Sequence, residues 1–292
     1  MRREGPPRAS NSAPTGGSEA AKPRARGDHT SAAFDVLARE LDAWGENGMR
    51  ATLWWRDDDA ERDSPQLRRL LATARVHRVP IAIAAIPAGA DCTLAAAIAD
   101  CPPASVVQHG YAHANHAPPG ERSAELGAHR SVPERIAELD RGSETLRALF
   151  AHRFVPVLVP PWNRIAGDIV GALPRAELRG LSCFGARATR EPVRGLVQAN
   201  AHVDLIAWRR DRRFIGAAAA LERLAAHLRA RREGEADASE PTGILTHHLV
   251  CDDDAFVFLD ACCVFLHDHP AAAWLGVDAI FSALPFTSVR SA

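Results

Sequence analysis

The chain has 292 residues, of which 47% are hydrophobic, and this suffices for one large globular domain or two small ones. The formal net charge at pH 7 is −1, so composition gives no reason to expect a nucleic acid or a membrane surface as partner. No apolar run approaches the length that spans a bilayer, and we therefore expect no integral membrane protein.

The N-terminal segment differs in composition from the rest of the chain. Residues 1–30 are rich in Pro, Gly, Ser and Arg, with a basic start but without the apolar stretch of a secretory signal. This composition predicts a disordered tail, followed by a single domain over residues 31–292. The six cysteines form no CxxC pair, which favours a reduced, cytoplasmic protein.

Strand and helix patterns alternate along the remaining chain. The expected strands are residues 49–55, 79–87, 104–108, 154–160, 180–184, 203–208 and 243–248. The expected helices are residues 34–44, 64–78, 94–100, 132–152, 165–173, 217–234 and 254–269, and residues 274–284 close the chain. Such alternation predicts parallel βαβ units and an α/β fold.

Polar residues follow four of the expected strands. In chain order they are Asp57, Asp58 and Asp59, then His109, then the Pro-Pro-Trp turn at 160–162, then His247 and His248. Chemistry in α/β barrels sits at the C-terminal ends of the strands. We therefore expect these side chains to meet at one edge of the sheet.

His109 and His113 have a spacing of four residues, which points both rings the same way on a helical turn or a loop of that shape. Two imidazoles and one carboxylate are the ligands of a catalytic metal site with open positions for water. The alternatives are a pair of surface histidines and, for the aspartates, a solvated turn or helix N-cap. His247 and His248 point to opposite faces of a strand, so only one of them is expected at the site.

Taken in order, the motifs DD, HxxxH, PP-aromatic, Asp before Trp, and LxH resemble the polysaccharide deacetylase superfamily, the NodB-homology fold of carbohydrate esterase type. The resemblance extends from about Leu53 to Leu249. It implies a distorted (β/α) barrel and a metal-dependent deacetylase, a hydrolase of C–N bonds other than peptide bonds. The implied reaction removes an acetyl or other acyl group from the nitrogen of an amino sugar or related amide.

The resemblance also implies roles for residues at the motif positions. It makes an aspartate pair the general base and a metal ligand, and the distance to Ser64-Pro65 favours Asp57 and Asp58 over Asp58 and Asp59. It makes His109 and His113 the other metal ligands and His247 the general acid. It assigns the oxyanion-binding backbone N–H to Trp162, and it places Pro161, Asp204 and Trp208 beside the substrate. The alternates are Asp59, His248, His116 and Arg164.

Two positions depart from the family pattern. Val159 stands where the family has an arginine that steadies the catalytic aspartate, and Ala207 replaces an acidic residue before Trp208. Arg56 or Arg164 is expected to supply the missing charge from another position.

The implied cofactor is a divalent metal ion, zinc first, with cobalt, nickel or iron as alternatives. The expected substrate is an acylated sugar or small amide, and the oligomeric state is not predicted. Two alternatives stay open: an amidohydrolase that acts on a non-sugar amide, and a non-catalytic relative that binds carbohydrate.

Overall fold

The computed structural model describes residues 27–281, and for residues 27–32 it describes the backbone alone. Helix α1 (Gly27–Glu46) begins within the segment expected to be a tail, so that segment ends at least four residues earlier than predicted. The remainder of the predicted tail, residues 1–26, lies outside the described residues. No helix in the described part is long and apolar enough to cross a membrane.

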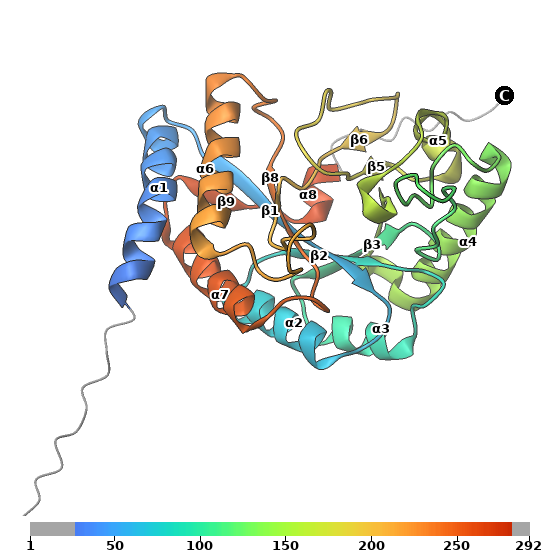
Figure 1. The fold of residues 1–292 in the computed structure, drawn as a ribbon, viewed down its shortest axis with the longest axis horizontal. Helices are drawn as coiled ribbons and strands as arrows, with labels where there is room; N and C mark the ends of the chain where they lie inside the picture. The colour runs from blue at the N-terminus through green and yellow to red at the C-terminus, as the bar shows by residue number, and fades with distance from the viewer. Residues whose placement is uncertain (1–26, 282–292) are drawn as a thin grey trace, which may run out of the picture.

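The strands form one sheet in which every pairing is parallel (Figure 1). Their order is β6-β5-β4-β3-β2-β1-β8-β7, and β9 pairs with β1. The bounds are β1 Ala51–Ala60, β2 Ile81–Ala85, β3 Ala104–His109, β4 Phe154–Val159, β5 Gly180–Leu181, β6 Val197–Gln198, β7 Val203–Asp204, β8 Thr242–Thr246 and β9 Ala272–Trp274. The predicted α/β fold is confirmed.

The sheet curls until its two ends lie close together. The terminal strands β6 and β7 are joined by only four residues, 199–202. At one end of this link the Ala199 N–H donates to Leu181 O of β5, and at the other the His202 N–H donates to Gly243 O of β8. The chain thus bridges the open side, and the expected distorted (β/α) barrel is confirmed.

Helices cover the outside of the barrel (Figure 1). They are α2 Pro65–His77, α3 Cys92–Ala99, α4 Val132–Phe150, α5 Gly167–Ala172, α6 Ala217–Glu233 and α7 Asp253–Asp268, with short 3₁₀ turns at Ala151–Arg153, Pro161–Asn163 and Leu173–Ala176. The short helix α8 Val277–Phe281 instead packs on the inner side of the sheet. The N-cap side chains of α2, α4 and α7, which are Ser64, Ser131 and Asp252, each accept a backbone N–H of the first turn.

Alternation along β1 sorts its side chains between two cores. Trp54 points into the barrel, where it meets Phe281 of α8 at a ring distance of 6.2 Å, and Trp55 packs in the layer between sheet and helices. The same period of two sends Arg56 inward and Asp57 outward. The strand that carries the aspartates is therefore fixed in register by two large indoles.

Candidate active site

The end of β1 breaks the strand period at the aspartates. The pairing of β1 with β2 shifts between Asp57 and Ala60, and Asp59 has a left-handed backbone with φ of 71°. Such a conformation is uncommon outside glycine, although Asp tolerates it better than most residues. As a result the side chains of Asp58 and Asp59 both lie inside the barrel mouth instead of pointing to opposite faces of the sheet.

Asp59 lies between the two histidines of the HxxxH motif. Its Oδ1 is 3.0 Å from His109 Nε2 and 3.3 Å from His113 Nε2. These three residues each offer a ligand atom, and the atoms lie within 4.8 Å of one another. The expected grouping of Asp58 with the two histidines is wrong, because the irregular end of β1 moves the register by one residue.

The side chains of this cluster fit a divalent metal ion. His109 Nδ1 lies 3.0 Å from the carbonyl oxygen of Val159, to which it donates, so Nε2 is the ring nitrogen that faces the cluster, and it would offer its lone pair to an ion that displaces its proton. Burial raises the pKa of the Asp59 carboxyl, but the hydrogen bond and charge of His109 outweigh it and hold that pKa well below its usual range. The ionised carboxylate and two imidazoles suit zinc, and equally cobalt, nickel or iron.

A buried glutamate shapes the loop that presents His113. Glu125, which is 1% exposed, accepts the backbone N–H groups of Tyr111 and Ala112 at 3.0 and 2.7 Å. Gly110 has φ of 56°, and a Cβ there would lie 1.9 Å from Glu125 Oε2. This tight turn, not a helix, brings His113 back beside His109.

Asp58 is held by an arginine of its own strand. Arg56 Nε lies 2.9 Å from Asp58 Oδ1, and Arg56 Nη2 donates to Oδ2 at 3.1 Å. The guanidinium is fully buried and also donates to Ser182 Oγ at 2.6 Å and to Asn163 Oδ1 at 2.7 Å. Arg56 therefore supplies the charge that the motif position Val159 lacks. Arg164 instead donates to the Ser123 carbonyl.

His247 faces the same mouth from the end of β8. Its Nε2 is 4.0 Å from Asp58 Oδ2, and its Nδ1 is 3.9 Å from Asp204 Oδ1. The Trp208 indole meets the His247 ring edge-on at 4.7 Å and donates to Asp204 Oδ2 at 2.7 Å. The motif residues Asp204, Trp208 and His247 thus form one contact group.

His248 points to the opposite face, as strand alternation predicts. Its Nδ1 lies 2.5 Å from Asp57 Oδ2, and its backbone N–H and the Thr246 hydroxyl both donate to Asp57 Oδ1. Asp57 is fully buried in this outer network, so its expected place at the site is wrong. The acidic residues that follow His248 in the sequence belong to the start of α7, with Asp252 as its N-cap.

The remaining predicted residues flank the cluster. The Trp162 ring lies 4.3 Å from that of His113, and its left-handed backbone (φ 56°) turns the chain at the end of β4. Pro161 packs beside Gly110. His116 lies farther along the same loop, with its backbone N–H bonded to Ala124 O, and is not part of the metal-type cluster.

A second group of histidines occurs at the N-terminal end of β8. His202, His227 and Glu240 lie together, and His202 Nε2 is 3.4 Å from Glu240 Oε2. The backbone N–H of Gly243 donates to His202 Nδ1, so the neutral ring carries its hydrogen on Nε2. A ring protonated on Nε2 offers no lone pair there, and this group is a poor metal site.

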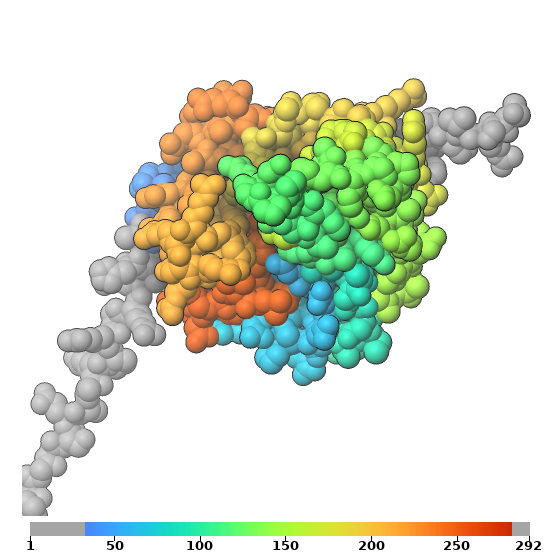
Figure 2. Space-filling model, turned by 45° about the vertical axis from the view of Figure 1, so that its right-hand side comes forward, coloured from blue at the N-terminus to red at the C-terminus, as the bar shows by residue number. Residues whose placement is uncertain are grey.

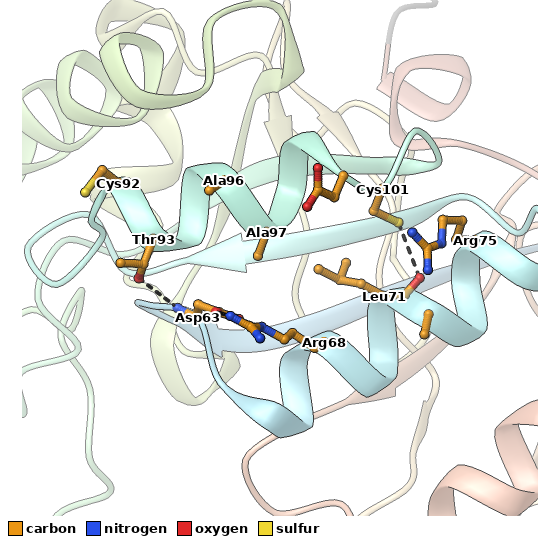
Figure 3. A pocket seen from close by; sticks show the side chains of 11 residues that line it. Asp63, Arg68, Leu71, Arg75, Cys92, Thr93, Ala96, Ala97 and Cys101 are labelled. Atoms are coloured by element: carbon orange, nitrogen blue, oxygen red, sulfur yellow. Dashed lines mark hydrogen bonds and ion pairs between the residues drawn. The ribbon is translucent and has the colours of Figure 1, made fainter.

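A cavity of about 640 Å³ opens on the outside of the barrel, between α2 and α3 (Figure 3). Its polar lining includes Asp63 and Arg68, which form an ion pair with each other. None of the residues of the barrel mouth lines it. The convergent carboxylates and imidazoles therefore make the barrel mouth the better candidate.

No protein-family model and no curated protein matches the chain. Solved structures do match it. A protein from Mycobacterium smegmatis, described as a candidate polysaccharide deacetylase, is 16% identical with a TM-score of 0.61, and the match covers 80% of this chain and 90% of that one. A family 4 carbohydrate esterase from Streptomyces lividans, in complex with acetate, is 13% identical with a TM-score of 0.51, covering 77% and 91%.

A third structure, a mutant of BA3943, is described as a family 4 pseudoenzyme; it is 14% identical with a TM-score of 0.52, and the match covers 80% of this chain and 67% of that one. At these identities the likeness shows the fold alone. The chain has the fold of the polysaccharide deacetylases, and the resemblance seen in the sequence is confirmed at that level.

Proposed function

We propose that the protein is a metal-dependent hydrolase that removes an acyl group, in the first place acetyl, from the nitrogen of an amino sugar. The observation that carries the proposal is the meeting of Asp59, His109 and His113 with Asp58 and His247 at one mouth of this barrel. Amide hydrolysis needs an activated water, a group to take its proton and a group to return one to the leaving nitrogen. The candidate site offers residues for each task.

Asp59, His109 and His113 would hold the metal ion. When bound there, a zinc-type ion lowers the pKa of a coordinated water toward ~7 and polarises the acyl oxygen. Asp58 then accepts the proton of the attacking water, and the Arg56 guanidinium holds that carboxylate in place.

His247 stands across from Asp58 and donates a proton to the leaving nitrogen. Asp204 lies beside Nδ1 of this ring, and Trp208 packs on the edge of the ring, so the two residues help to position it. The backbone N–H of Trp162 contributes to binding the oxyanion, a role implied by the family motif.

The substrate and compartment are parts of the same proposal. An acetylated amino sugar as substrate is supported by similar structures, which include a carbohydrate esterase in complex with acetate and a protein described as a candidate polysaccharide deacetylase. A cytoplasmic location is supported by the six cysteines, all of them free thiols in the structure. A non-sugar amide remains the alternative substrate.

The non-catalytic alternative has a specific observation behind it, since one similar structure is a pseudoenzyme. The loss of the motif arginine at Val159 points the same way, but the Arg56–Asp58 pair compensates for it. The base, the acid and the ligand cluster are all present, which favours catalysis.

The test is acetate release from a panel of acetylated amino sugars, with protein loaded separately with zinc, cobalt and nickel. We expect release with at least one metal, and we expect His109→Ala to abolish both metal binding and release. Bound metal without release from any sugar or amide would support the non-catalytic alternative. A wild-type protein that binds no metal would overturn the proposal.

A further inference from the structure

Arginines from three loops gather at the rim of the proposed site. The loop after β3 carries Arg122, the turn after β4 carries Arg164, and the loop after β7 carries Arg209, Arg210, Arg212 and Arg213. Figure 2 shows a hollow between the green loop that follows β3 and the gold-orange segment ahead of α6. We call these six residues the arginine rim.

The arginine rim is tied to the site by short sequence links. Arg164 follows Asn163, whose side chain accepts a hydrogen bond from Arg56 inside the barrel. Arg209 follows Trp208, which packs on His247, and the Arg212 guanidinium lies 5.3 Å above the Trp208 ring. These charges therefore lie near His247, the residue proposed as the general acid.

The rim charges also lie close to one another. Arg164 donates to the carbonyl of Ser123, which joins the β4 turn to the β3 loop beside Arg122. Burial and the like charges of Arg122 and Arg209 lower the pKa of Arg164, and these neighbours belong to the two other loops. The charges of Arg122 and Arg209 thus both act on the Arg164 guanidinium.

No carboxylate within the described residues forms an ion pair with any member of the rim. Two acidic residues adjoin rim members in the sequence: Asp211 accepts the backbone N–H of Arg213, and Glu121 lies 3.3 Å from His129 Nε2. Some arginines elsewhere in the barrel are paired, as in Arg130–Glu138 and Arg187–Asp237. What distinguishes the rim is that six arginines without an ion pair among the described residues belong to the three loops that follow β3, β4 and β7, in a chain of net charge −1.

We infer that the arginine rim binds an anionic group of the substrate, a phosphate or a carboxylate, next to the acyl amide that the barrel mouth hydrolyses. Guanidinium groups match the planar or tetrahedral oxygens of such anions with paired hydrogen bonds. A bound anion relieves the repulsion that Arg122 and Arg209 exert on Arg164. The hydrolysis of the acyl amide in this inference rests on the proposed function, whereas the binding of the anion does not.

The anion site is tested by calorimetric titration of the full chain with inorganic pyrophosphate and, in a separate arm, with citrate. Chelator-treated protein is used so that bound metal cannot hold either anion. The double variant R164A/R209A removes two rim charges, and Arg223→Ala, an exposed α6 position on the outside of the barrel, is the matched control. Circular dichroism and melting temperature confirm that each variant folds.

We expect at least one anion to bind the wild type and the Arg223→Ala control alike, and to bind R164A/R209A at least tenfold more weakly. The arm with the tighter ligand identifies phosphate or carboxylate as the preferred group. Equal binding by the double variant, or no binding of either anion to the wild type, overturns the inference.

Activity separates this inference from the proposed function. The zinc-loaded enzyme is assayed with N-acetylglucosamine and its 6-phosphate, and R164A/R209A should raise KM for the phosphorylated sugar alone. Anion binding that depends on the rim, without acetate release, would overturn the proposed function and leave the rim in place. Acetate release from both sugars with equal kcat/KM, together with no anion binding, would overturn the anion site and leave the proposed function in place.

Discussion

Arg56 and Asp58, two residues apart on β1, form an ion pair inside the barrel, with Nε 2.9 Å from Oδ1 and a hydrogen bond of 3.1 Å from Nη2 to Oδ2. The guanidinium is fully buried and Asp58 is 1% exposed. Arg56 thus takes the role that the family motif gives to an arginine at position 159, which is to steady the aspartate. Its neighbours Ser182 and Asn163 fix the guanidinium on the other side.

Arg56→Lys tests the positioning role of this residue. Lysine keeps one charge but loses the two-point grip on Asp58, so we expect kcat to fall by about tenfold or more with metal content unchanged. Arg56→Met should be much less stable, by about 3–5 kcal/mol, because it leaves Asp58 buried without a partner. Unchanged kcat in Arg56→Lys would show that Asp58 needs no such support.

The register of the aspartates is tested by two isosteric variants. Asp59→Asn should lower metal content at least tenfold, because it weakens one of three ligands. Asp58→Asn should keep the metal and lose about 10²–10⁴ in rate, as expected for a proton acceptor. Elemental analysis beside acetate release decides between them, and loss of metal in Asp58→Asn with retention in Asp59→Asn would restore the register expected from the sequence.

His247 and His248 should differ in what their loss affects. His247→Ala is expected to lose about 10²–10⁴ in rate while it keeps its metal. His248→Ala removes a hydrogen-bond partner from the buried Asp57 carboxylate, and should lose about 1–3 kcal/mol of stability with most of its activity retained. An inactive, stable His248→Ala together with an active His247→Ala would reverse the assignment.

The half-buried, stacked His202–His227 pair predicts a pH dependence of stability. Burial, followed by the charges of His202 and Arg231, lowers the pKa of His227 to about 3, below its value near 6.5 in an unfolded chain. Between these values the unfolded state binds the extra proton, so the contribution to stability is complete above pH 6.5 and is lost as pH falls toward 3.

His227→Gln removes this titration and keeps a polar group near Thr242. The melting temperature of the wild type should therefore fall more steeply between pH 7 and pH 5 than that of the variant. Groups away from this pair titrate equally in both proteins and cancel, so the difference reports His227 together with its stacked neighbour His202. Parallel profiles would show that His227 is not buried as a neutral ring.

The sequence predicted the architecture well because its signals are periodic. Apolar runs and helical patterns gave the alternation of the sheet and its covering helices. The same period of two placed His247 at the mouth and His248 behind the sheet, which the structure confirms.

The aspartate register was missed for a local reason. It depends on a bulge and on the left-handed backbone of Asp59, and neither has a sequence signal in a run of three aspartates. Spacing to the next helix counts residues along the chain, but a bulge changes the face on which they point.

Three supporting residues had no signal of their own, namely Glu125, Ser182 and Asn163. Each acts through a contact distant in sequence, such as the hydrogen bond from Arg56 to Ser182, 126 positions away. Only the folded barrel brings such partners together. The glycine directly after His109 was a hint in the sequence that the loop held by Glu125 turns sharply, and in the structure it has a left-handed backbone.

The central claim is metal-dependent deacylation at the Asp59–His109–His113 cluster. The most direct measurement is acetate release from an acetylated amino sugar by one preparation, assayed as loaded with zinc, after chelation and after zinc is added back. We expect acetate release by the zinc-loaded protein, loss of that release on chelation and its recovery when zinc is added back. Release that persists undiminished in the chelated protein would contradict the central claim.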